Sequence, residues 1–346
     1  MRRALAALVA VLLLLPGPAR GNDLLLGLFE RYLDALRRQA GIPGLAAAIV
    51  GETGILWERG FGFQDIEQAV AAQPDTPWHL DGLTQIVTAT LVLRCVEEGR
   101  LSLDDRVASV DPRSPEAGAT VRQLLAHAPA DGPAAFQYRP ERLVALAPVV
   151  EACTGRPFAA AVGALLDRLA MMDSVPGHDA VDAPDLFERP AIERYAAVLR
   201  RLAVPYAVDA RNRASRSVYV ATRLGPAGGL VSTARDLARF DLALRQGVLL
   251  RPETLAIAWR GLADDTGRPL PHGLGWFVQV RNGEPIVWQF GVAANASSSL
   301  VITAPRRQVT LILLANSDGL VAPFPLAAGD LSASPFGRLF LGLFAA

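Results

Sequence analysis

The order of its hydrophobic patterns constrains this 346-residue chain more than any other feature. Apolar residues form short strand-like runs near the start, at 45–50 and 55–63, and again in four runs between residues 273 and 316. Most of the sequence from about residue 76 to residue 260 instead repeats apolar side chains at a helical period. Strands at both ends with helices between them predict one antiparallel sheet built from both chain ends, flanked by helices.

This order predicts a mixed α/β (α+β) fold with an inserted helical domain. Residues 20–75 and 225–346 would form the sheet and the helices that cover it, and residues 76–224 would form the insert. Pockets favour the junctions between structural units. We therefore expect a cleft where the sheet meets the helical insert.

The first 19 residues predict a secretory signal peptide. Arg2 and Arg3 precede an apolar run from Ala4 to Leu15, and the small residues at 16–19 offer a cleavage site. The apolar run is short for a bilayer span, which takes about 20 residues. We expect export to the periplasm or the extracellular space, with membrane contact only through an uncleaved signal.

The charge composition limits the chemistry that the chain can perform. The 34 positions counted as lysine or arginine are all arginine, so no lysine can act as a general base or Schiff-base former. The formal net charge is zero, and nothing in the composition indicates a nucleic-acid partner. Asp104 and Asp105 have no histidine in register and predict a turn rather than a metal site. We expect no cofactor.

The two cysteines, Cys95 and Cys153, both fall in apolar segments with a helical pattern. Export would permit a disulfide between them. Their apolar surroundings instead favour buried free thiols. Neither has a neighbour that indicates nucleophilic or metal chemistry.

Local signals mark several helix starts. Thr120 and Gln123 form the capping-box pattern, and Pro140 suits the first turn of the next helix. Ser334 and Pro335 predict the start of a last helix, which we expect to pack on the sheet.

Several segments resemble the serine β-lactamases and penicillin-binding-protein-like hydrolases, most closely their class C β-lactamase and esterase/D-aminopeptidase branch. The resemblance extends from about residue 24 to the end of the chain. It implies a serine hydrolase fold. The segments that carry it are IPGLAAAIV (42–50), TATLVLRCVEEGRLSLDDRV (88–107), VRQLLAHAPADG (121–132), YRPERLVALAPVVEACTGRPF (138–158), GPAGGLVSTARDLARF (225–240) and GLGW (273–276).

The same resemblance implies a Ser-x-x-Lys motif at the front of a helix. There the serine attacks an acyl carbon, and the lysine one turn later accepts its proton. The matching residues of this chain are Gly82 and Gln85, so the nucleophile and the base are both missing. A predicted helix over 82–98 would carry them.

Two further family motifs are also incomplete. Tyr-x-Asn falls on residues 138–140, which keep Tyr138 and have proline in place of the asparagine. Lys/His-x-Gly falls on residues 290–292, where Phe290 replaces the cation and valine replaces the last glycine. The family's two oxyanion donors would be the backbone N–H groups of Gly82 and Ala293.

The sequence therefore predicts a catalytically inactive homologue with a remnant cleft. The first N–H groups of a helix lack partners within it and carry partial positive charge, so the cleft could still hold a carbonyl oxygen. We expect it to bind a cell-wall or acyl-type small molecule or a protein partner. The residues expected at this cleft are Gly82, Gln85, Tyr138, Phe290 and Ala293.

Two other interpretations stay open. The chain could hydrolyse an ester, amide or cell-wall peptide with residues outside the family's set, or it could be a structural module whose cleft is filled by side chains. Among the other polar residues, we expect Ser297–Ser299 to face solvent, Asp81 to cap a helix and His127 to lie in the core. His79 is a weaker candidate for the cleft.

Overall fold

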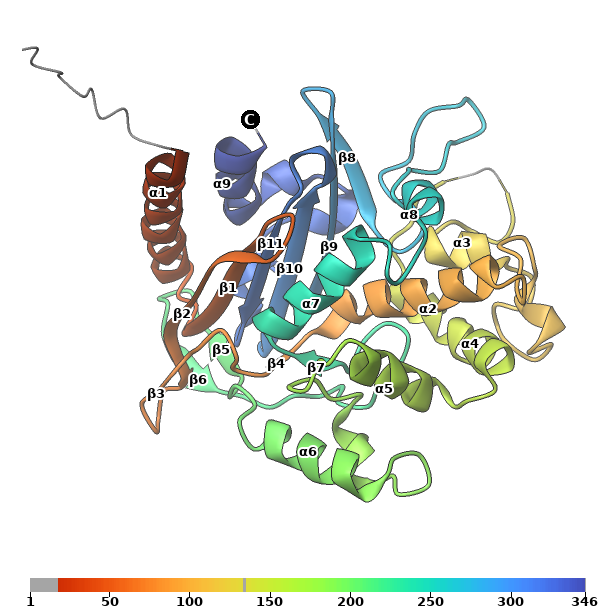
Figure 1. The fold of residues 1–346 in the computed structure, drawn as a ribbon, viewed down its shortest axis with the longest axis horizontal. Helices are drawn as coiled ribbons and strands as arrows, with labels where there is room; N and C mark the ends of the chain where they lie inside the picture. The colour runs from red at the N-terminus through yellow and green to blue at the C-terminus, as the bar shows by residue number, and fades with distance from the viewer. Residues whose placement is uncertain (1–17, 133–134, 346) are drawn as a thin grey trace, which may run out of the picture.

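A computed structural model describes residues 18–132 and 135–345. At its centre lies a seven-stranded sheet in the order β3-β2-β1-β11-β10-β9-β8, in which every pair of neighbours is antiparallel (Figure 1). The sheet draws its strands from both ends of the chain, which confirms the predicted architecture. The strands are β1 (Gly44–Val50), β2 (Ile55–Asp65), β3 (Val70–Ala71), β8 (Phe277–Arg281), β9 (Glu284–Ala293), β10 (Ser297–Ala304) and β11 (Val309–Ala315).

Helices cover both faces of this sheet, so its middle strands are buried on both sides (Figure 1). On one face, α1 (Pro18–Gln39) and α9 (Pro335–Phe344) pack against each other and share a hydrophobic cluster with the sheet. On the other face, α2 (Gln85–Glu97) and α7 (Ala234–Arg245) belong to a second cluster. The predicted packing of the last helix on the sheet is confirmed, because Phe336 and Phe340 are buried there.

The remaining helices lie mainly beyond α2, on the side of α2 away from the sheet (Figure 1). Two short two-stranded pairings lie outside the central sheet. These elements are α3 (Val121–Leu125), α4 (Leu146–Thr154), α5 (Phe158–Arg168), α6 (Arg189–Leu199), α8 (Pro252–Ala258), β4 (Trp78–His79) with β7 (Val231–Ser232), and β5 (Tyr206–Val208) with β6 (Ala214–Arg216).

The local signals place the helix starts well, with one difference at the site. Thr120 and Gln123 form a complete capping box at α3, and the Ser334 hydroxyl accepts the Gly337 N–H at the start of α9. Pro140 begins a 3₁₀ turn that leads into α4. The helix predicted over 82–98 instead opens with a 3₁₀ turn, Asp81–Thr84, and the α-helix begins at Gln85.

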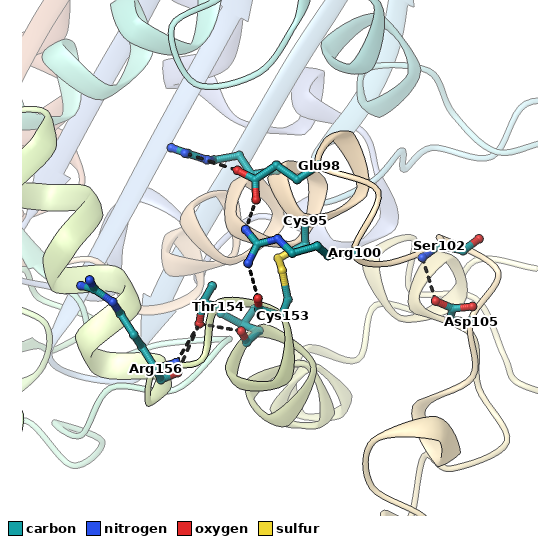
Figure 2. Close-up of a disulfide and its surroundings, with 10 residues drawn as sticks. Cys95, Glu98, Arg100, Ser102, Asp105, Cys153, Thr154 and Arg156 are labelled. Carbon is teal, nitrogen blue, oxygen red and sulfur yellow. Dashed lines mark hydrogen bonds and ion pairs between the residues drawn. A yellow bond between two sulfur atoms is a disulfide. The ribbon is translucent and has the colours of Figure 1, made fainter.

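The expectation of free thiols is wrong. Cys95 on α2 and Cys153 on α4 form a disulfide with their Cα atoms 6.2 Å apart (Figure 2). Both cysteines do lie on helices, as predicted. Helical periodicity shows which residues of one helix share a face, but it does not show that the faces of two helices meet. The pairing therefore depends on the packing of α2 against α4.

The expectation that Ser297–Ser299 face solvent is also wrong. All three residues have an exposed fraction of 0%. They begin β10, which lies between β9 and β11 inside the sheet, so both faces of this strand are covered. Alternation of polar and apolar residues predicts a solvated face only for a strand with one open side.

No single helix in residues 18–132 and 135–345 combines the length and the apolar composition needed to cross a bilayer. Residues Pro140–Thr154 and Phe158–Arg168 meet that test only as a pair bent by 70°. The predicted signal peptide falls mostly on residues 1–17, which lie outside the described residues. The boundaries of the helical insert at 76 and 224 stay a prediction.

Candidate active-site remnant

A pocket of about 400 Å³ lies where the 3₁₀ turn before α2 meets the end of β9. Of the five residues expected at the cleft, four line this pocket and the fifth, Gln85, lies directly behind Tyr138. The lining residues are Asp81, Gly82, Tyr138, Pro140, Val220, Ala221, Ala227, Gly228, Gly229, Phe290, Gly291, Val292, Ala293, Ala294 and Ala296.

The wall of the pocket depends on a very close approach between two backbones. A Cβ atom at Gly291 would lie 2.0 Å from the Leu80 carbonyl oxygen and 2.8 Å from the Gly82 nitrogen. The Ser299 hydroxyl donates to the same Leu80 oxygen at 2.7 Å. Glycine is therefore required at 291, because any side chain would push the turn away from β9.

Gly82 presents only backbone to the pocket. A Cβ atom there would lie 3.0 Å from the Phe290 carbonyl oxygen and 3.4 Å from Gln85 Nε2. A larger residue would thus fit only if its neighbours shifted by a few tenths of an ångström. Gly82 has no hydroxyl to attack a carbonyl carbon.

Gln85 links two aromatic side chains in a chain of hydrogen bonds. The Arg139 N–H donates to His127 Nδ1 at 3.2 Å, so the neutral imidazole carries its hydrogen on Nε2. This Nε2–H donates to Gln85 Oε1 at 2.9 Å, and Gln85 Nε2 donates to the Tyr138 oxygen at 2.9 Å. Each of the three side chains therefore has a defined donor or acceptor role. Gln85 is hydrogen-bonded through both its carbonyl oxygen and its amide nitrogen.

Burial keeps this network uncharged. It lowers the pKa of His127 to about 4 and raises the pKa of Tyr138 to about 12. Tyr138 lines the pocket, while its hydroxyl oxygen accepts from Gln85, which is 1% exposed. Between these two pKa values, imidazole, amide and phenol are all neutral, so none of the three groups carries charge near neutral pH.

Phe290 extends an aromatic cluster beneath the pocket. Its ring centroid lies 5.2 Å from that of Tyr138, 5.6 Å from Phe277 and 6.0 Å from Trp288. Only 4% of Phe290 is exposed. A ring in these surroundings contributes apolar packing and offers no charge to an anionic ligand. His127 also lies in the core, as expected, although it contacts Gln85 directly.

The expected capping role of Asp81 is wrong. Its backbone has φ +49°, a left-handed conformation that aspartate tolerates better than most residues, and no side-chain cap forms at this turn. The carboxylate instead accepts the Ser297 hydroxyl at 2.5 Å and lies 3.4 Å from His79 Nδ1. That second contact is too poorly aligned to be a hydrogen bond, since both ring nitrogens of His79 lack a partner.

Sequence reasoning missed the roles of Ser297 and Ser299, whose hydroxyls hold the turn before Gly82 through Asp81 and Leu80. The run of three serines was the available signal, but their burial depends on the position of β10 within the sheet. His79 is buried beside Asp81 and is not among the residues that line the pocket. Within residues 18–132 and 135–345, no three His, Cys, Asp or Glu side chains are placed to hold a metal ion.

A sequence model of the Beta-lactamase family matches residues 29–331, which is most of the chain. The chain belongs to the beta-lactamase family. Its similarity to the penicillin-binding-protein-like hydrolases, expected from the sequence, is thereby confirmed.

One relative is similar in sequence to a part of this chain. The chain is 32% identical over 91 residues to protein flp of Staphylococcus aureus (strain NCTC 8325 / PS 47), a match that spans 25% of this chain and 18% of flp. The chain therefore matches less than a fifth of the length of protein flp.

Solved structures share the fold across almost the whole chain. The octameric penicillin-binding protein homologue from Pyrococcus abyssi has a TM-score of 0.72 and 19% identity, and the match covers 92% of this chain and 77% of that one. The D-amino acid amidase from Ochrobactrum anthropi SV3, complexed with L-phenylalanine amide, has a TM-score of 0.71 and 18% identity, with 93% and 98% coverage. At this identity the likeness shows the fold alone.

Proposed function

We propose that this chain is an exported beta-lactamase-family protein that performs no serine acyl-enzyme chemistry and binds a ligand at the remnant cleft. The observation that carries the proposal is the neutral network of Gln85. An amide bonded on one side to His127 and on the other to Tyr138 accepts no proton from a nucleophile, and Gly82 supplies no nucleophile.

The loss of these groups removes most of the rate that such a site can provide. Removing an acyl-transfer nucleophile typically costs about 10⁶ in kcat, and removing its base as well adds little because the two act as a unit. A background of about 10³–10⁴ over water can persist from binding and backbone donors. We therefore propose binding without turnover as the function.

The pocket keeps the shape and backbone chemistry for a small ligand. Its volume of about 400 Å³ lies within the usual range for ligand sites, roughly 300–1,000 Å³. Gly82, in the first turn before α2, and Ala293, at the end of β9, both line the pocket, and the oxyanion donors that we propose are their backbone N–H groups. A carbonyl or carboxylate oxygen fits partial positive charge of this kind.

The ligand that we propose is a cell-wall or acyl-type small molecule, or a segment of a protein partner with the same groups. The amidase that shares this fold is complexed with L-phenylalanine amide, which supports a small amide as a first candidate. The open pocket also argues against a purely structural module, because Phe290 packs beneath the cleft and leaves space above it.

Covalent probes test the absence of acyl-enzyme chemistry. We expect no label when the purified protein is incubated with a fluorescent penicillin or a fluorophosphonate, while an active family member labels under the same conditions. A stoichiometric adduct mapped to any residue of the pocket would contradict the proposal. Thermal shift with cell-wall fragments and amino-acid amides then tests ligand binding, since a ligand that binds only the folded state raises Tm.

One observation favours a second candidate function, hydrolysis of an ester or amide without an acyl-enzyme. Asp81 lines the pocket next to Gly82, and a carboxylate at such a position could act as general base toward a water that attacks a bound carbonyl. Turnover of p-nitrophenyl esters that survives repurification and disappears in Asp81→Asn would support this candidate. If Asp81→Asn and the unmodified protein turn over the ester equally, the activity belongs to a contaminant or to the backbone donors of Gly82 and Ala293.

Export is a separate part of the proposal. It is based on the signal-like residues 1–19, and the Cys95–Cys153 disulfide supports it because structural disulfides persist mainly in oxidising compartments. Fractionation of cells that express the full chain should place it outside the cytoplasm, and deletion of residues 4–15 should retain it inside. Equal cytoplasmic accumulation of both forms would contradict export.

A further inference from the structure

A second hollow lies at the far end of α2, between α2 and α5. Its volume is about 280 Å³. Each helix contributes one face at the spacing i, i+3, i+4, i+7, and the residues after α2 and around the end of α4 close one end. The lining residues are Leu91, Arg94, Cys95 and Glu98, then Arg100, then Thr154 and Arg156, and finally Ala161, Ala164, Leu165 and Arg168.

Positive charge is concentrated at this hollow. Four arginines line it, Arg94, Arg100, Arg156 and Arg168, and Glu98 is the only acidic residue among its lining residues. The chain as a whole has a formal net charge of zero, so this excess is local. Leu91, Leu165 and two alanines form an apolar floor between the charged groups.

The four arginines differ in the ion pairs and hydrogen bonds that they form. Arg100 forms an ion pair with Glu98 and donates to the Cys153 carbonyl oxygen (Figure 2). Arg94 reaches the same Glu98 only at 3.8 Å. The backbone N–H of Arg156 donates to Thr154 Oγ1 at 3.3 Å, and Figure 2 shows its guanidinium extending away from that contact. Arg168 Nη2 donates to the Val248 carbonyl oxygen at 3.4 Å. Among the lining residues, the single carboxylate of Glu98 therefore stands against four arginines.

Mutual repulsion acts on Arg94 in particular. Burial lowers the pKa of Arg94, and the positive charges of Arg168 and Arg100 lower it further, against the opposite effect of Glu97. Cations near a helix C-terminus are individually favourable because of the helix dipole. That effect acts on each arginine alone, and it does not account for four arginines that line one hollow with an apolar floor.

We propose that this hollow is a binding site for a phosphorylated small molecule with a short apolar stem. A guanidinium group presents paired N–H donors that match two phosphate oxygens, and charge-assisted bonds of this kind are stronger than neutral ones. The phosphate group would lie among Arg94, Arg156 and Arg168. The stem would lie along the floor, against Leu91 and Leu165.

This site is separate from the remnant cleft. The two pockets share no lining residue. Arg94 lies nine residues after Gln85 on the same helix, which corresponds to about 13 Å along the axis. The disulfide from Cys95, a lining residue, to Cys153 ties α2 to the end of α4, so the frame of the hollow is covalently braced.

Calorimetric titration of the full chain with octyl phosphate, inorganic phosphate and octylamine tests the proposal. We expect saturable binding of octyl phosphate, weaker binding of inorganic phosphate and no binding of octylamine, which is cationic at neutral pH. No saturable binding of octyl phosphate would overturn the proposal. Equal binding of octylamine would also overturn it, because the apolar floor alone would then explain the affinity. Equal affinity for both phosphates would overturn the assignment of the stem.

Matched variants locate the site. Arg156→Gln should weaken octyl phosphate binding about tenfold, the effect of losing one charge-assisted contact, and Arg94→Gln should add to it. Arg189→Gln on α6 is the control, because that side chain is 89% exposed and forms its ion pair with Glu193, away from the hollow. Ala164→Phe fills the hollow without changing its charge and should abolish octyl phosphate binding. Equal weakening in the Arg189→Gln control, or full binding in Ala164→Phe, would place the ligand elsewhere.

Discussion

The two ends of α2 have opposite chemistry. At the front, Gln85 joins a neutral imidazole and a neutral phenol above a cluster of aromatic rings. At the far end, Arg94 and Arg100 share Glu98 beside a disulfide. The front of α2 therefore lies in an uncharged, hydrogen-bonded setting behind one pocket, whereas its far end presents a strongly positive surface to another.

The difference follows from burial. Gln85 and His127 are each 1% exposed, and an uncompensated charge at that depth would be costly. The Arg100 side chain is 47% exposed, so water solvates its guanidinium even where its neighbours carry the same charge. The comparison shows that the front of α2 holds neutral, hydrogen-bonded groups where burial is deep, and that its far end holds charged groups where water can reach them.

The largest effect that we expect at the charged end is on stability. Cys95→Ser with Cys153→Ser removes a bond that closes 58 residues of sequence. Loop-closure entropy then predicts a loss of about 4 kcal/mol in the free energy of unfolding. Urea unfolding of the double variant and the parent measures it. An unchanged midpoint would show that packing of α2 on α4 holds this end without the bond.

The next effect concerns pH at the neutral end. His127 has a folded pKa of about 4 against an ordinary value of 6.5, so the unfolded chain binds more protons between these values. Stability should therefore fall as pH drops from about 6.5 to about 4, by about 3 kcal/mol from this residue, and stay level above that range. Burial lowers the pKa of His178 and His272 in the same direction.

Urea unfolding of the parent and His127→Gln at pH 7 and near pH 4.5 isolates this contribution, because the other titrating groups are common to both proteins. The variant should lose less stability on acidification than the parent does. An identical pH dependence would show that His127 is as easily protonated in the folded state as in the unfolded chain.

A smaller effect should follow from breaking the neutral network at its centre. Gln85→Met leaves the Tyr138 hydroxyl and the His127 Nε2–H without their partner. An unsatisfied buried polar group costs about 1–3 kcal/mol, so we expect a loss of about 2 kcal/mol in unfolding experiments. Adding Tyr138→Phe should cost less than the sum of the two single changes, because the two residues are in contact. Strict additivity would contradict the hydrogen bond.

The smallest effect should come from restoring the family motif. Gly82→Ser with Gln85→Lys returns a hydroxyl and an amine, yet the new Cβ would contact the Phe290 carbonyl oxygen at 3.0 Å and the amine would be buried between His127 and Tyr138. We expect no detectable acylation by a fluorescent penicillin. Substantial labelling would show that the turn at Gly82 and the surroundings of residue 85 adjust to the two new side chains.

Much of the candidate site could be predicted from sequence because its motifs lie in segments with strong local signals. Gly82, Tyr138, Phe290 and Ala293 were expected at one cleft, and they line one pocket. The roles of Ser297, Ser299 and Asp81 could not be predicted in this way. Each depends on contacts across more than 200 residues of sequence, which no local pattern encodes.

The sequence by itself determined the order of strands and helices, the capping of α3 and α9, and the absence of a hydroxyl at position 82 and of an amine at position 85. These features depend on periodicity, capping chemistry and residue identity, which act over a few residues. Only the tertiary structure decided that the cysteines are bonded, that three serines are buried and that four arginines line one hollow. Those features arise where elements distant in sequence pack together, and packing sets both burial and the neighbours of each side chain.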